Sequence, residues 1–84
     1  MIPISEISHI QNHKDLSEFI GKLRRDYLEN PDSWENQDLP SYLEALAAWL
    51  SDSGGYYRNT DQPMPTAETW KTIATILYAS KIYE

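Results

Sequence analysis

The sequence from Trp34 to Leu50 is WENQDLPSYLEALAAWL, and it joins a turn of aromatic, acidic and amide residues to the most regular helical pattern in the chain. At 3.6 residues per turn, its large apolar side chains fall on one side of a helix. This side comprises Leu39, Tyr42, Leu43, Leu46, Ala47, Trp49 and Leu50. We therefore predict a core-facing helix over 39–51, with Asp38 as its N-cap and Pro40 in its first turn.

A second helix is predicted over 15–29. Asp15 and Glu18 have the spacing of an N-cap residue and its partner three positions later. An apolar stripe follows at helical spacing and runs as far as Tyr27. Pro31 disfavours a helical conformation for the residue before it, so this helix should end near Asn30.

A third helix is predicted over 66–82, beginning at Thr66, and it carries two apolar stripes where an outer helix needs one. The first stripe comprises Trp70, Ile73, Ala74, Leu77 and Tyr78, and the second comprises Ile76, Ala79 and Tyr83. The second stripe indicates either a central helix covered on both sides or an interface for self-association with another copy of the chain.

The remaining segments have no clear period. The isoleucines of residues 1–11 fit either an extended arm or a brief helix, and the pattern leaves both open. Residues 51–65, SDSGGYYRNTDQPMP, contain two Gly and two Pro and predict a long loop. The expected fold is thus all-α, a single domain over 1–84 in which three main helices form a small bundle with a short N-terminal element and a long loop.

Charge and composition narrow the classes of function. The 84 residues carry a net charge of −6, and no Lys or Arg occurs between Asp26 and Tyr57. Such an acidic band argues against nucleic-acid binding, which needs clustered basic residues, and leaves a basic protein partner or simple solubility as its role. There is no Cys and no long apolar run, so we expect a cytoplasmic protein that does not enter membranes.

No spacing typical of an enzyme or a cofactor site is present. His9 and His13 are four residues apart, but no third metal ligand accompanies them, so we expect exposed histidines and no metal site. Glu35 and Asp52 flank the predicted helix over 39–51, and acidic residues at such positions usually cap helices or remain solvated. We expect no catalytic residues and no cofactor.

Two short stretches are candidate interaction surfaces. Trp34, Glu35 and Asn36 lie in a turn, where the Trp ring either fills the end of the bundle or serves as an exposed anchor. Tyr56, Tyr57 and Arg58 combine the residue types that dominate interface hot spots, although the tyrosines could instead close the core. Trp49 and Trp70 are expected in the core because they lie on apolar stripes.

The same stretches resemble a small bacterial family of unknown function. The resemblance extends from Asp15 to Glu84 and is most specific at the motifs WEN (34–36), YLEAL (42–46), WL (49–50), GYY (55–57), Trp70 and KIYE (81–84). It implies a free-standing cytoplasmic protein from bacteria with no assigned activity. No functional residue can be transferred from the family to this chain.

Two hypotheses about function follow. The first is an acidic interaction or regulatory module of the immunity, antitoxin or accessory-subunit type, with an unknown protein partner. The second is a small-molecule binder or minor enzyme whose pocket lies between residues 52–65 and the Trp34 turn. A homodimer formed through Ile76, Ala79 and Tyr83 is a separate expectation about assembly.

Overall fold

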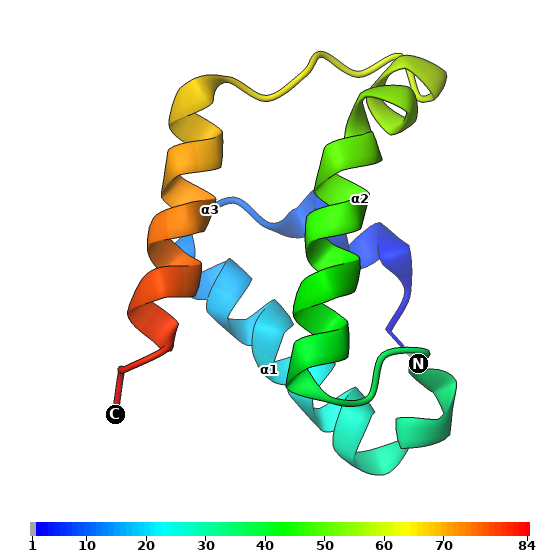
Figure 1. Ribbon diagram of the computed structural model, residues 1–84, viewed down its shortest axis with the longest axis vertical. Coiled ribbons are helices and arrows are strands. Elements are labelled where there is room, and N and C mark those ends of the chain that lie inside the picture. The colour runs from blue at the N-terminus through cyan, green and yellow to red at the C-terminus, as the bar shows by residue number, and fades with distance from the viewer. Residues whose placement is uncertain (1) are drawn as a thin grey trace. The chain divides into compact units, whose positions relative to one another are not determined.

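The computed structural model describes residues 2–84, whose regular secondary structure is all helical, with no strand (Figure 1). The elements in chain order are η1 (Ile4–His9), α1 (His13–Glu29), η2 (Pro31–Ser33), α2 (Leu39–Asn59) and α3 (Ala67–Ser80). They form two compact units, Met1–Leu46 and Ala47–Glu84, and α2 runs from the first unit into the second. The prediction of an all-helical chain with three main helices is confirmed.

The N-terminal element η1 is a 3₁₀ helix, so the brief helix is the correct one of the two alternatives for this segment. Pro3 precedes it in an extended conformation, and the Pro3 carbonyl accepts a hydrogen bond from the Glu6 N–H at 3.1 Å. The Lys22 ammonium lies 3.1 Å from both carboxylate oxygens of Glu6 and ties η1 to α1.

Helix α1 begins two residues earlier than predicted, and its N-cap is Asn12 instead of Asp15. The Asn12 side-chain oxygen accepts a hydrogen bond from the Asp15 N–H at 2.8 Å, and the Asp15 carboxylate accepts one from the Gln11 N–H at 3.0 Å. Asp15 therefore occupies the third helical position of a capping arrangement, where its negative charge also interacts favourably with the helix dipole. The end of α1 at Glu29, two residues before Pro31, agrees with the prediction.

Helix α2 starts as predicted and ends eight residues later than predicted. Its start is capped by Asp38, whose carboxylate accepts a hydrogen bond from the Ser41 N–H at 2.8 Å. Residues 52–59, which were assigned to the long loop, are helical, and neither Gly54 nor Gly55 adopts a positive φ. The prediction of a loop over 51–65 is therefore wrong in its first half, because a Gly pair lowers helix stability by about 2 kcal/mol relative to alanine without ending the helix.

The actual end of α2 is a Schellman motif centred on Asp61. Asp61 has a φ of 55°, in the left-handed region, and its N–H donates to the Arg58 carbonyl at 3.3 Å. The next N–H, of Gln62, reaches back to the Tyr57 carbonyl at 2.9 Å. These two bonds satisfy carbonyls that the last turn would otherwise leave unpaired. The left-handed residue is usually Gly, and an aspartate there gives a weaker sequence signal for a helix end than glycine does.

Helix α3 follows Thr66, its N-cap, and runs antiparallel to the end of α2 (Figure 1). Both of its apolar stripes remain accessible, with Ile76 41% and Leu77 44% exposed.

No apolar side chain of residues 2–84 is fully buried, and Trp49 is 48% exposed. The prediction that Trp49 lies in the core is wrong, because the helical face that carries it has no element of its own unit packed over it.

We expect Asp61→Gly to raise the free energy of unfolding by about 1 kcal/mol, because glycine adopts a left-handed conformation without steric cost. Chemical denaturation followed by circular dichroism measures the change. Asp61→Ala is the matched control: it removes the same charge but keeps a β-carbon, and we expect a change within about 0.5 kcal/mol. Equal stabilisation by both variants would show that the charge of Asp61, and not its backbone conformation, lowers the free energy of unfolding.

The cap of α2 makes stability depend on pH. The Ser41 N–H, with a smaller contribution from the Ser41 side chain, lowers the pKa of Asp38 below its ordinary value of 3.8. A lowered pKa contributes stability above 3.8 that is lost as the pH falls through the lower value of the folded state. We expect Asp38→Asn, which keeps the accepting oxygen but does not titrate, to show a shallower loss of unfolding free energy between about pH 4 and about pH 2. Identical acid profiles for the two proteins would contradict this role.

Candidate functional site

The Trp34 turn is a packed corner in the first unit. The indole N–H of Trp34 donates to the Asp26 carboxylate at 2.8 Å, and the ring is half-buried. The Tyr27 ring of α1 packs edge-on against the Trp34 ring, with the ring centroids 5.5 Å apart. The Tyr42 ring of α2 also packs on Trp34, with a centroid distance of 6.0 Å. The Tyr27 hydroxyl donates to the Gln37 carbonyl at 2.6 Å, which fixes the turn against α1. Trp34 therefore holds the connection between α1 and the start of α2.

The neighbours of Trp34 differ in accessibility. Glu35 is exposed and Asn36 is half-buried. The corner thus exposes the Glu35 carboxylate to solvent, whereas the neighbouring Trp34 ring already packs against Tyr27 and Tyr42. As a surface for a partner, Trp34, Glu35 and Asn36 remain a prediction.

The helical conformation of residues 52–59 separates the side chains that the sequence grouped together. Consecutive residues of a helix are about 100° apart, so Tyr56 and Arg58 point about 160° away from one another around α2. The Arg58 guanidinium lies over the Gly pair, 3.4 Å from the place that a Gly54 β-carbon would occupy. Tyr56, Tyr57 and Arg58 therefore do not form one patch.

Tyr56 instead shares a face with Trp49, seven residues earlier. Their ring centroids are 5.4 Å apart, and Tyr57 completes the cluster at 5.2 Å from Tyr56 and 6.5 Å from Trp49. Trp49 and Tyr56 are 48% and 43% exposed, whereas Tyr57 is half-buried. Sequence reasoning missed this pair because it placed Trp49 in the core and Tyr56 in a loop.

A carboxylate stands beside the exposed pair. Asp52 is three residues after Trp49 and four before Tyr56, so all three side chains lie on one face of α2. Asp52 is exposed, and in the part of the chain that the structure describes no basic group pairs with it. We name Trp49, Asp52 and Tyr56 the α2 surface.

An apolar groove lies beside the α2 surface, within the second unit. It has a volume of about 360 Å³ and is lined by Leu50, Ser53, Met64, Trp70, Ile73, Ala74 and Leu77. Its only hydroxyl, that of Ser53, donates to the Leu50 carbonyl at 2.8 Å, so it is not aimed at a ligand. The groove is where α3 faces α2, and Trp70, which belongs to the first predicted stripe of this helix, is half-buried in it.

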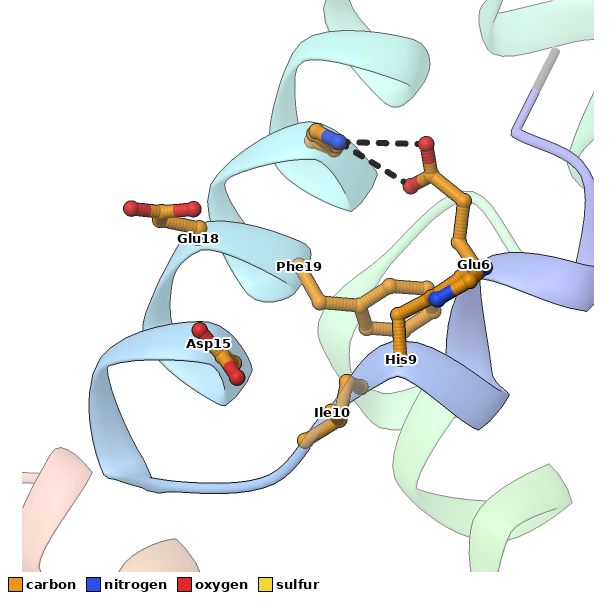
Figure 2. Close-up of a pocket in the computed structure, with 7 residues that line it drawn as sticks. Glu6, His9, Ile10, Asp15, Glu18 and Phe19 are labelled. Atoms are coloured by element: carbon orange, nitrogen blue, oxygen red, sulfur yellow. Dashed lines mark hydrogen bonds and ion pairs between the residues drawn. The ribbon is translucent and has the colours of Figure 1, made fainter.

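A second pocket, of about 230 Å³, lies between η1 and α1 in the first unit (Figure 2). The Phe19 ring points from α1 toward His9 and Ile10, and the ion pair of Glu6 with Lys22 closes one side. These polar groups are used in fixing η1 to α1. Within residues 2–84, no set of three or more His, Asp and Glu side chains is placed to hold a metal ion.

Comparison with known proteins gives a family and no activity. A family model described as "Family of unknown function (DUF7660)" matches residues 12–84. No curated protein and no solved structure matches the chain. Among the described residues, no helix has the length and apolar character needed to cross a membrane.

We expect Trp34→Phe to lower the free energy of unfolding by about 1 to 2 kcal/mol. The variant keeps an aromatic ring against Tyr27 and Tyr42 but removes the N–H that donates to the half-buried Asp26 carboxylate. Denaturant unfolding measures the loss. Tyr78→Phe removes a hydroxyl from a side chain that is 72% exposed and should change stability by less than about 0.5 kcal/mol. If Trp34→Phe lowers the free energy of unfolding no more than Tyr78→Phe does, the hydrogen bond of Trp34 to Asp26 does not stabilise the fold.

Proposed function

The chain belongs to the DUF7660 family, whose function is unknown, and we propose that it is a small protein-interaction module without catalytic activity of its own. Its partner is a protein that presents a basic side chain next to apolar residues. The α2 surface is the part of the molecule that receives this side chain.

The exposed pair of Trp49 and Tyr56 carries the proposal. Two large aromatic rings with centroids 5.4 Å apart, each about half exposed, give a rigid apolar platform on a regular helix. Trp and Tyr are the residue types most enriched among interface hot spots, because they contribute large contact areas at low entropic cost. A helix also holds them more firmly than the loop that was expected there.

Charge determines the kind of side chain that fits. The faces of Trp and Tyr attract cations, and the neighbouring Asp52 carboxylate supplies a full negative charge on the same face. The net charge of −6 adds attraction at longer range. An arginine of the partner can stack on a ring and pair with Asp52 at once, which makes arginine the preferred occupant.

This function fits an immunity protein, an antitoxin or an accessory subunit, all of which act by binding another protein. Trp34, Glu35 and Asn36 remain a second candidate surface in the first unit, and Arg58 is proposed to contribute only at the margin because it lies across α2 from Tyr56. The alternative of a small-molecule binder or minor enzyme remains a prediction.

Affinity purification from the native cells tests the proposal. A tagged chain should retain a basic protein at near-equal amounts at low salt, and recovery should fall as salt screens the charges. Asp52→Asn and Tyr56→Ala should each reduce recovery at least about tenfold, equivalent to about 1.4 kcal/mol of binding free energy. Quantitative mass spectrometry of the eluted proteins gives the recovery.

Tyr78→Ala is the matched control, since it removes another accessible tyrosine of the second unit that is 72% exposed. It should retain the partner. A partner that is recovered equally with Asp52→Asn, Tyr56→Ala and the unchanged chain does not bind the α2 surface. Failure to recover any protein in near-equal amounts would reject the module itself.

A further inference from the structure

The outer face of α3, opposite the groove, has the spacing of a helix–helix seam. Thr72, Ile76, Ala79 and Tyr83 follow one another at intervals of four, three and four residues, the alternation that places side chains along one line between paired helices. The Tyr83 N–H donates to the Ala79 carbonyl at 3.1 Å, so the helical turn continues beyond Ser80 and includes the last of these positions. We name these four residues the α3 seam.

The short hydroxyl side chains on and beside the α3 seam are already hydrogen-bonded within α3, so burying them costs little. The hydroxyls of Thr72 and Thr75 donate to the carbonyls of Glu68 and Lys71 at 2.9 Å, and the Ser80 hydroxyl donates to the Ile76 carbonyl at 2.7 Å. Each of these three hydroxyl protons is thus used within α3 itself. Removing Thr72, Thr75 and Ser80 from water therefore leaves none of these three hydroxyl donors without an acceptor.

We infer that the α3 seam binds a second copy of this chain, in a two-fold dimer with the two α3 helices antiparallel. A charged partner would not be drawn to this face, since the seam and its flanking positions Ile73, Thr75, Ser80 and Ile82 carry no charge. Two copies that each have a net charge of −6 repel one another, and an uncharged face is where they approach at the lowest electrostatic cost.

The sizes of the side chains select the antiparallel orientation. In that arrangement Ile76 of one copy faces Ala79 of the other, and Tyr83 faces Thr72, so each large side chain meets a small one. A parallel dimer would instead pair Tyr83 with Tyr83 and Ala79 with Ala79. Alternating large and small side chains fill an interface without voids, and two alanines leave one.

The accessible area is sufficient for a transient dimer. Ile76, Ile82 and Tyr83 are 41%, 73% and 87% exposed, equivalent to about two whole side chains or roughly 300 to 400 Å² per copy. With the exposed small residues of the same face, each copy can bury about 500 to 600 Å², close to the smallest specific interfaces of about 1,200 Å² in total. Interfaces at this low end of the size range are typical of transient complexes, so we expect the dimer to be populated only at high protein concentration.

Sedimentation equilibrium of the full chain between about 1 μM and about 1 mM tests self-association. The unchanged chain should approach twice its 9.8 kDa mass. Ala79→Glu, which puts a charge in the seam, should weaken the dimer at least about tenfold. Tyr78→Glu adds the same charge one residue away, outside the seam, and should dimerise like the unchanged chain. Circular dichroism establishes that both variants fold.

Cysteine pairing tests the orientation, because the chain has no cysteine of its own. Under mild oxidation, a mixture of the Ile76→Cys and Ala79→Cys chains should form mixed disulfides faster than either chain pairs with itself. Faster self-pairing of Ala79→Cys would overturn the antiparallel arrangement. A 9.8 kDa species up to about 1 mM, or equal dimerisation of Ala79→Glu and Tyr78→Glu, would overturn the α3 seam as an interface.

Discussion

The continuity of α2 from Leu39 to Asn59 determines which side chains of this protein act together. A helix that ended at Ser51 would leave Tyr56, Tyr57 and Arg58 on a flexible segment, with no fixed relation to Trp49. Because the helix continues to the left-handed turn at Asp61, Tyr56 is held 5.4 Å from Trp49 and one turn from Asp52. The same continuity directs Arg58 across the helix, over Gly54.

Periodicity predicted the elements better than it predicted their ends. The apolar stripes of α1, α2 and α3 were sufficient to place three helices, since a spacing of 3.6 residues has no other simple explanation. The ends depend on individual hydrogen bonds. Asn12 and Asp38 are both good N-caps, yet only one of the two was identified, because Asp15 and Glu18 gave an equally good pattern three residues later. Asp61 ends α2 in a left-handed conformation that aspartate adopts less often than glycine, so the sequence marks this helix end only weakly.

The candidate site was less accessible to sequence reasoning, because burial depends on what packs against a face and not on the face alone. Trp49 and Trp70 lie on equally regular apolar stripes, but Trp70 lines the groove between α3 and α2, whereas Trp49 lies beside Tyr56 and remains 48% exposed. Asp52 became part of a surface only when the helix placed it on the same face as the two rings. In contrast, the second apolar stripe of α3 was recognised from spacing, since Ile76, Ala79 and Tyr83 fall on one side of any helix that contains them.

The two proposed surfaces depend on different forces, which allows one chain to use both. Binding at the α2 surface combines a carboxylate with aromatic faces, so dissolved salt weakens it by screening the attraction of opposite charges. The α3 seam carries no charge, and what opposes pairing there is repulsion between two chains of net charge −6, which salt also screens. Rising ionic strength therefore shifts the balance from the basic partner toward the second copy. Such opposite responses distinguish an electrostatic contact from a hydrophobic one even when both involve exposed aromatic side chains.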